Sequence, residues 1–188
     1  MTPEQLLYKI VRILKDLKIP YAITGGFAVA VWGKPRFTAD IDIIIELTSQ
    51  NIPPLTKTLL AINKDVYVSE KAMRDALKRK GEFNFIHPQT GLKVDFWVTD
   101  SKADIYGKLK LERAVAKKID RQKIFFVSPE DLILSKLIWY KESESPKHLE
   151  DVKTIFNNSK LKLDLNYIKK RANSQGTLEI LEKLREKT

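Results

Sequence analysis

The chain has 188 residues, 43% of them hydrophobic and 31% charged, which is typical of one compact soluble protein with a sizeable core. It contains no cysteine and only two histidines, His87 and His148, which excludes disulfide frameworks, thiolate zinc sites, cysteine nucleophiles and histidine-rich metal clusters. No apolar run approaches the ~20 residues that cross a bilayer, and the N-terminus lacks a signal-peptide core. We therefore expect a cytoplasmic protein with no membrane partner.

Basic side chains outnumber acidic ones by 34 to 24, which gives a formal charge of +10. The excess is concentrated between residues 71 and 123, which hold 14 basic and 7 acidic side chains. Such a density attracts nucleic acid or nucleotide phosphates, although a merely solvated surface can have the same composition. We predict that Lys78, Arg79 and Lys80 belong to a basic rim beside the functional site.

The first 80 residues predict a succession of short elements. Apolar residues recur at helical spacing after a capping box at residues 2–5, and the β-branched run over 41–45 predicts a central strand. Proline, glycine and capping residues separate the other elements. In chain order we expect a helix over 3–18, a strand over 21–24, a short helix over 27–32, the strand over 41–45, and helices over 51–63 and 70–80.

The next stretch predicts two hairpins and the last one only helices. Ser69 is expected to cap the helix over 70–80, and Gly81 to end it. Turn residues 88–91 predict a hairpin of strands 83–87 and 92–98, and a second hairpin is expected to join 111–119 to 123–127. Another capped helix start, at 128–131, opens a segment without a convincing strand.

The predicted fold class is α+β, with a small mixed β-sheet, flanking helices and a C-terminal helical segment. We expect a catalytic core over 1–127 and a helical segment over 128–188 packed on it.

Two carboxylates stand two residues apart on the predicted central strand. Asp40 and Asp42 should point to the same face of the sheet, because side chains at i and i+2 of a strand do so, with Cα atoms roughly 6.6 Å apart. Such a pair repels and is costly to bury without a counter-charge, and a divalent cation with oxygen ligands resolves the conflict. Solvated strand ends are the common alternative.

Other features of the sequence strengthen the prediction of a metal-dependent reaction at phosphate. Gly25 and Gly26 lie between a strand and a helix, where backbone N–H groups can approach an anion, although a glycine pair can also be a simple turn. Asp95 is a third acid, embedded in an apolar strand, where a satisfied buried acceptor is the alternative. An anion cradle with three strand-borne carboxylates indicates two-metal phosphoryl or nucleotidyl transfer. The common phosphate-loop, dinucleotide, zinc-protease and serine-hydrolase motifs are missing.

These residues resemble a known superfamily. Ile23-Thr24-Gly25-Gly26, followed by Gly33-Lys34-Pro35-Arg36-Phe37-Thr38-Ala39-Asp40-Ile41-Asp42, is similar to the nucleotidyltransferases of the DNA polymerase β superfamily. With residues 128–137 and Asp151-Val152, the pattern resembles the AbiEii-type branch, some of whose members are toxins of toxin–antitoxin pairs that modify tRNA. The chain departs from that branch in its short length and in lacking an arginine-rich helix pair after Lys136.

The resemblance implies a role for each of these residues. Asp40, Asp42 and Asp95 would be catalytic and would hold two Mg²⁺ ions, with Mn²⁺ as an alternative. The nucleotide-binding residues would be Thr24, Gly25, Gly26, Arg36 and Lys136. Arg36 can also be read as a solvated loop residue and Lys136 as a surface lysine. Trp32, Trp97 and Trp139 are expected in the core rather than as base-stacking platforms.

The implied activity is Mg²⁺-dependent transfer of an NMP from an NTP to an acceptor hydroxyl, with release of pyrophosphate. A tRNA or other RNA acceptor competes with a small molecule, as in aminoglycoside- and lincosamide-modifying enzymes, and with a protein hydroxyl. The basic stretch favours RNA. A cognate antitoxin is a further implied partner. The alternative class is a non-catalytic nucleic-acid-binding module on the same fold.

Overall fold

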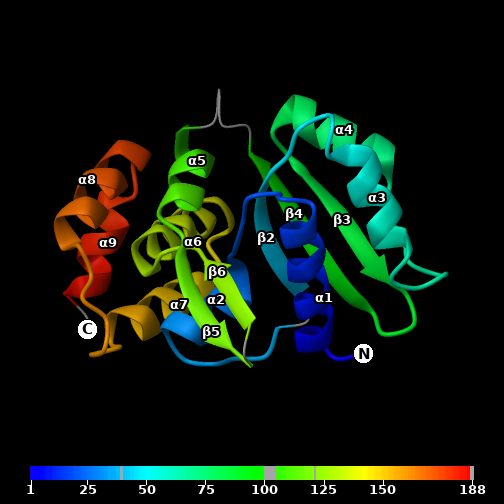
Figure 1. Ribbon diagram of the computed structural model, residues 1–188. Coiled ribbons are helices and arrows are strands. Elements are labelled where there is room, and N and C mark those ends of the chain that lie inside the picture. Colours follow the sequence, from blue (N-terminus) through cyan, green and yellow to red (C-terminus); the bar gives the residue numbers. More distant parts are fainter. Residues whose placement is uncertain (39, 100–104, 121, 187–188) are drawn as a thin grey trace. The chain divides into compact units, whose positions relative to one another are not determined.

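The computed structural model describes residues 1–38, 40–99, 105–120 and 122–186 (Figure 1). The chain divides into two compact units, which we call the sheet unit (1–26 and 37–127) and the helical unit (27–36 and 128–188). The division falls inside helix α2 (Gly25–Trp32), whose first two residues belong to the sheet unit. No helix in the described part of the chain is long and apolar enough to cross a membrane.

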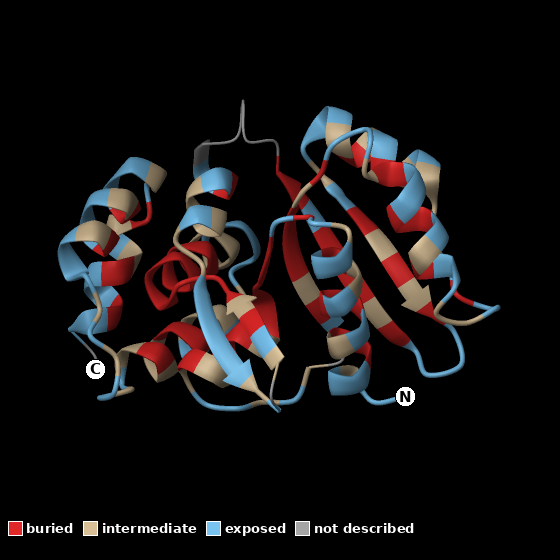
Figure 2. Ribbon diagram, viewed as in Figure 1, coloured by how far each residue is buried: buried red, intermediate tan, exposed pale blue. Residues whose placement is uncertain are grey.

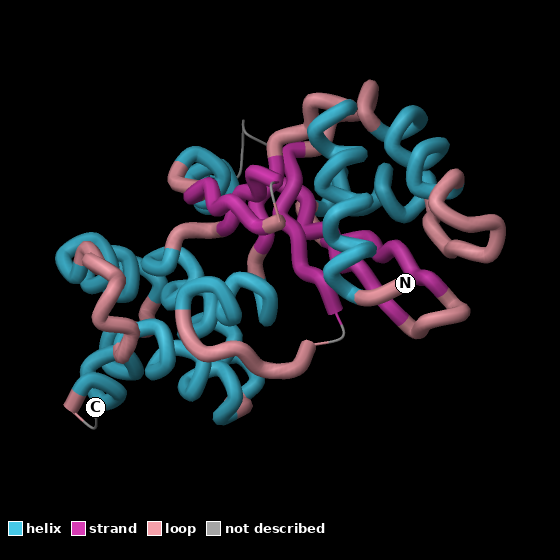
Figure 3. The backbone as a smooth tube through the Cα atoms, turned by 60° about the horizontal axis from the view of Figure 1, so that its bottom comes forward, coloured by secondary structure: helices cyan, strands magenta, loops and turns pink. Residues whose placement is uncertain are grey.

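The described strands of the sheet unit form one mixed sheet in the order β3-β4-β2-β1-β6-β5, seen as a single layer in Figure 3. β2 is parallel to β4 and β1 to β6, and the other neighbours are antiparallel. The mixed sheet expected from the sequence is confirmed. The strands are β1 (Tyr21–Ile23), β2 (Asp40–Glu46), β3 (Glu82–His87), β4 (Leu92–Thr99), β5 (Val115–Ile119) and β6 (Gln122–Phe126).

Alternation along β2 separates an apolar face of the sheet from a polar one. Ile41, Ile43 and Ile45 are fully buried, while Asp40 and Asp42 point to the opposite face. Buried and less buried positions also alternate along β3 (Figure 2). Three helices form one layer beside the sheet: α1 (Pro3–Asp16) packs on β2, α4 (Glu70–Arg79) packs on β3 and β4, and α3 (Ile52–Leu60) lies between these two helices.

Capping residues fix the helix starts that the sequence predicts. Thr2 and Gln5 form the capping box of α1, and the Ser69 hydroxyl accepts from the N–H of Ala72 at the start of α4. The end of α4 differs from expectation. Lys80, with φ of 54°, ends the helix in the left-handed conformation, one residue before the Gly81 that we expected to end it.

The second hairpin is shorter than the sequence predicts, and it is preceded by a helix that we did not expect. Residues 111 and 112 were assigned to a strand but belong to α5 (Ile105–Glu112), and β5 begins only at Val115. The physical reason is composition: lysine, leucine and glutamate favour a helix, and the β-branched and aromatic residues of the hairpin come later. α5 packs against β1 and β2.

The described part of the chain after residue 128 is helical, as expected. The helices are α6 (Pro129–Ser143), α7 (Pro146–Phe156), α8 (Leu165–Gln175) and α9 (Leu178–Arg185). The Ser128 hydroxyl accepts from the backbone N–H of Asp131 at 3.1 Å and donates to its carboxylate at 2.8 Å. Because α6 packs against both α7 and α8, its first nine residues are buried without interruption.

Candidate active site

The polar face of the sheet brings two of the three predicted carboxylates together. Asp42 of β2 and Asp95 of β4 are direct partners in the parallel register, so both side chains leave the same face at the same level. Asp40 is exposed at the first position of β2, where its partner is Lys93 rather than an acid. Asp42 and Asp95, which are 53 positions apart in the sequence, are therefore neighbours in the fold.

Asp95 is buried but incompletely bonded. Its exposed fraction is 7%, and the Lys93 ammonium donates to its Oδ2 atom at 2.8 Å. Its Oδ1 atom is buried and has no hydrogen-bond partner among the described residues. The hydrogen bond to Asp95 raises the pKa of Lys93, whereas burial, followed by the negative charge of Asp95, raises the pKa of Glu82 on the neighbouring strand β3. Three carboxylates, those of Asp95, Asp40 and Glu82, thus act on the charge of Lys93.

As these side chains stand, no three acidic or histidine groups in the described part of the chain are gathered closely enough to hold a metal ion. In this arrangement Lys93 occupies one oxygen of Asp95. The sequence did not single out this lysine. Its position two residues before Asp95 on the same strand, and therefore on the same face, was the signal that could have found it.

The two glycines are the first residues of α2 rather than preceding it. Each lies in close contact with a side chain of residues 38–42, the later part of the sequence motif. Gly25 has a φ of +61°, and a Cβ atom there would overlap the carboxylate of Asp42. A Cβ on Gly26 would lie 2.8 Å from the Cβ of Thr38. The N–H of Thr24, which is 2% exposed, donates to the Asp42 carbonyl at 2.9 Å. Glycine is therefore required here by packing as well as by any approach of an anion.

The other two predicted nucleotide-binding residues lie in the helical unit, bonded to one carboxylate of α7. Arg36 donates from Nε and Nη2 to Asp151 at 2.7 and 2.9 Å, and Lys136 of α6 donates to Asp151 at 2.8 Å. Burial favours a raised pKa for Asp151, but the hydrogen bonds from Arg36 and Lys136 outweigh it, and the pKa is lowered. Lys136 is 2% exposed, so the alternative of a surface lysine is wrong. The sequence did not assign Asp151 a partner.

Aromatic residues occupy different environments from the ones expected. Trp32 is buried, as predicted for the core, and Trp139 is half-buried with the Lys136 ammonium 4.9 Å from its ring centroid. The Trp139 ring also lies 5.7 Å from that of His148, whose pKa is lowered by burial. Trp97 is 37% exposed on the carboxylate face of β4, so its assignment to the core was wrong.

A family model described as "Nucleotidyl transferase of unknown function (DUF2204)" matches residues 4–186. The chain belongs to this family. It is therefore a nucleotidyltransferase, which confirms the activity class implied by the sequence resemblance and favours an enzyme over a non-catalytic binding module. The AbiEii-type branch stays a prediction. No curated protein sequence matches the chain.

Solved structures with a similar fold are also nucleotidyltransferases. ANT(2″)-Ia, solved with adenylyl-2″-tobramycin, has a TM-score of 0.60 and 15% identity, covering 92% of this chain and 96% of its own. The lincosamide antibiotic adenylyltransferase LnuA, solved with lincomycin, has a TM-score of 0.55 and 16% identity over 83% and 98%. An antigenic nucleotidyltransferase-like protein from Paracoccidioides brasiliensis has a TM-score of 0.53 and 21% identity over 95% and 94%. At these identities the likeness establishes the fold.

Proposed function

We propose that this nucleotidyltransferase uses a divalent cation, Mg²⁺ or Mn²⁺, held by Asp42 and Asp95 with Asp40 beside them, to transfer an NMP from an NTP to an acceptor hydroxyl. The observation that carries the proposal is the state of Asp95. A buried carboxylate oxygen without a partner is costly, and such an atom in a native structure calls for an explanation. A cation bound between Asp42 and Asp95 would provide the missing partner.

The residues present fit such a cation. Mg²⁺ prefers carboxylate oxygens and keeps part of its coordination for substrate phosphates. Asp42 and Asp95 share one level of the sheet, and the negative charge of Asp40 and Glu82 adds to theirs, while Lys93 supplies the only positive side chain found beside Asp95 in the described residues. The carboxylates therefore retain a net negative charge that a cation would neutralise.

When bound, a divalent cation would stabilise negative charge on the transferring phosphoryl group and its leaving group. The chain's own residues would do the rest. Asp42 and Asp95 would orient the triphosphate through that site, and Asp95 would favour deprotonation of the acceptor hydroxyl. The amides of Gly25 and Gly26 at the N-terminus of α2, with Thr24, would receive the phosphates. Triphosphate binding by Arg36 and Lys136 stays a prediction from the sequence.

For the acceptor we propose an RNA hydroxyl, with tRNA included in that class. The support is charge: the chain carries +10, and 14 basic side chains lie between residues 71 and 123. A small-molecule hydroxyl is the second candidate, because ANT(2″)-Ia, solved with adenylyl-2″-tobramycin, and LnuA, solved with lincomycin, resemble this chain over nearly their full lengths. A protein hydroxyl and a cognate antitoxin stay predictions.

Incubation with each α-labelled NTP, Mg²⁺ and total RNA, followed by location of the label, tests this function. Label in a discrete RNA that disappears with EDTA and with Asp95→Asn supports the proposal. Label that persists undiminished in Asp95→Asn rejects the carboxylate site. Asp16→Asn is the matched control, since Asp16 is an exposed acid on α1 and its loss should leave transfer unchanged.

A further inference from the structure

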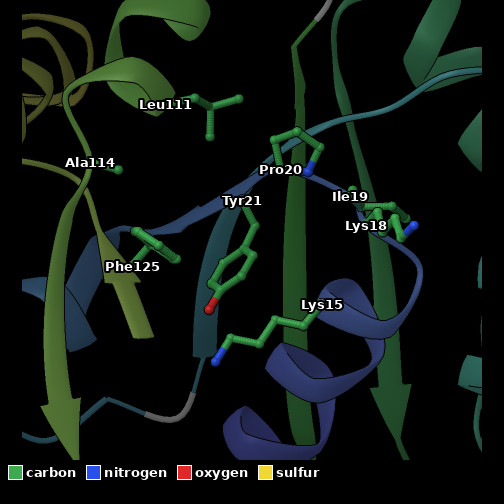
Figure 4. Close-up of a pocket in the computed structure, with 8 residues that line it drawn as sticks. All are labelled: Lys15, Lys18, Ile19, Pro20, Tyr21, Leu111, Ala114 and Phe125. Carbon is green, nitrogen blue, oxygen red and sulfur yellow. The ribbon is translucent and has the colours of Figure 1, made fainter. Parts of the chain in front are cut away.

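The sheet unit contains a pocket that the proposed active site does not use. Its volume is about 320 Å³, at the lower end of the range for small-ligand pockets (Figure 4). It lies beside the start of β1. The only position at which β1 pairs with β6 in the described residues is Ile23 with Phe126, so the two strands are not paired next to the pocket. The lining residues are Lys15, Lys18, Ile19, Pro20, Tyr21, Leu111, Ala114 and Phe125.

Tyr21 supplies an unused hydrogen-bond donor in this pocket. The residue is 6% exposed, and its buried hydroxyl donates to no acceptor among the described residues. Burial raises the pKa of Tyr21 to about 12, against a smaller lowering effect of a hydrogen bond from the Phe125 backbone, so the hydroxyl keeps its proton at neutral pH. It therefore lacks an acceptor, which a ligand could supply.

The remaining walls combine aromatic and basic groups. The rings of Tyr21 and Phe125 meet edge to face, 5.9 Å apart, and Phe125 is only half-buried. Lys15 and Lys18 are exposed at the rim, and Figure 4 shows the Tyr21 hydroxyl and the Lys15 ammonium directed to the same end of the pocket. Lys123 adds a third cation, 5.3 Å from the Phe125 ring centroid. No acidic residue is found among the described lining residues.

Few ligand classes satisfy all these groups. A lipid chain would offer the Tyr21 hydroxyl no acceptor and the lysines no counter-charge, since the Lys15 ammonium has only the neutral Lys123 carbonyl as a partner among the described residues. Inorganic phosphate would leave the apolar walls in contact with water. A nucleotide meets each requirement, because its base stacks on aromatic rings, its carbonyl groups accept hydrogen bonds and its phosphate pairs with ammonium groups. Lys118 on the adjoining hairpin pairs with Lys123, on the same face as Phe125, and extends the positive surface beyond one phosphate.

We propose that this pocket binds one nucleotide, with its base against Phe125 and the Tyr21 hydroxyl and its phosphate at the rim that carries Lys15 and Lys18. The nucleotide is a unit of a single-stranded RNA or a free nucleoside monophosphate. The RNA source deepens the proposed function, because it provides a second contact for the RNA acceptor outside the carboxylate face.

The test measures binding to the full chain in EDTA, where nucleotidyl transfer is off. The probe is fluorescein-labelled hexauridylate, with unlabelled UMP as competitor. Tyr21→Phe keeps the ring and should weaken hexauridylate binding about fivefold, as the loss of one hydrogen bond predicts. The double variant Lys15→Gln/Lys18→Gln should make the salt dependence shallower by about 1.4 in logarithmic slope if both lysines contact phosphates. Lys57→Gln/Lys64→Gln, exposed on α3 and in the loop that follows it, removes the same charge outside the basic stretch 71–123 and should change the slope far less.

Protein stability separates a ligand role from a structural one. Tyr21→Phe should melt no lower than the parent, since its hydroxyl donates to no acceptor among the described residues, whereas Tyr8→Phe should melt lower because it loses a 2.8 Å hydrogen bond to Asp120.

Competition by UMP at an affinity near that of hexauridylate identifies a free nucleotide, and absence of competition identifies RNA. Parent-like binding by Tyr21→Phe, or equal slope changes in the two lysine pairs, overturns the pocket. If the protein binds hexauridylate normally but labels no RNA, the proposal of an RNA acceptor is wrong and the nucleotide pocket stands.

Discussion

Both units pair a lysine with a buried aspartate at 2.8 Å, but the two pairs differ in how completely the carboxylate is bonded. In the helical unit, Asp151 accepts from Lys136 and twice from Arg36, and both of its oxygens are satisfied. In the sheet unit, Asp95 accepts from Lys93, and its second oxygen has no partner among the described residues.

The exposure of the lysines differs in the same sense. The side chain of Lys136 is 3% exposed and that of Lys93 is 35% exposed. A buried, fully bonded pair can rearrange only at a large energetic cost, whereas a half-exposed lysine can leave its carboxylate for water. The comparison indicates that the Asp151 cluster is a fixed structural cross-link. In the Asp95 pair, by contrast, another cation could replace the Lys93 ammonium. The next four predictions test that contrast.

The largest effect is expected from the sheet carboxylates. Asp42→Asn or Asp95→Asn should reduce transfer by a factor on the order of 10² or more, because each removes a ligand charge from the proposed cation site. The double variant should lose little more than either single one, since the site acts as a unit. Transfer kinetics measure this, and additive losses would show that the two carboxylates act separately.

Asp151→Asn should have the largest effect on stability. Removing this charge leaves Arg36 and Lys136 without their carboxylate, and breaking a buried pair in this way costs about 3–5 kcal/mol. Asp95→Asn should change the free energy of unfolding by less than about 1 kcal/mol, because Lys93 can be hydrated. Urea denaturation of both variants measures the difference, and equal losses would remove the distinction between the two clusters.

Lys93 should compete with the cation. Lys93→Met should bind Mn²⁺ without nucleotide about fivefold more tightly than the parent, since a positive charge that occupies Asp95 is gone. Lys93→Arg keeps the charge and should bind Mn²⁺ as the parent does. Paramagnetic titration or calorimetry provides the affinity independently of catalysis. Unchanged or weaker binding by Lys93→Met would mean that the lysine does not guard the site.

Acid should weaken the helical unit through Asp151. Its pKa is lower in the folded chain than the ordinary value near 3.9, so its contribution is present above that value and is lost as the pH falls through the folded pKa. Denaturation between pH 5 and about 2 should show this loss in the parent and less of it in Asp151→Asn. Identical acid dependence in the two proteins contradicts a lowered pKa.

The smallest effect concerns the basic rim predicted at the end of α4. Lys78, Arg79 and Lys80 are exposed. Replacing all three by glutamine should make the salt dependence of RNA binding shallower by at most about 2 in logarithmic slope, if each contacts a phosphate. An unchanged slope would show that these residues face away from the bound polyanion, and that the basic surface used is elsewhere.

The structure also changes how one motif can be tested. Gly26→Val was the obvious way to block an anion, but a Cβ at Gly26 meets Thr38 and one at Gly25 meets Asp42. Loss of nucleotide binding in such variants therefore does not isolate the phosphate approach from local repacking.

Local rules in the sequence determined most elements of this protein. Periodicity, caps and turn residues are short-range properties, so the sequence predicted α1, β2, the β3–β4 hairpin and the capped start of α6. It also predicted that Asp40 and Asp42 share a face, because the period of a strand is two. The sequence pattern also singled out Asp95 as an acid in an apolar strand, and the family resemblance supplied the activity class that family membership then confirmed.

Tertiary structure alone decided what each charged residue bonds. The register between β2 and β4 set Asp42 beside Asp95 and set Lys93, not an acid, beside Asp40. The packing of α6 and α7 buried Lys136 against Asp151 with Arg36. Pairing across strands and helices depends on contacts between residues far apart in the chain, which short-range patterns do not encode. For the same reason the unpaired oxygen of Asp95 became visible only in the fold.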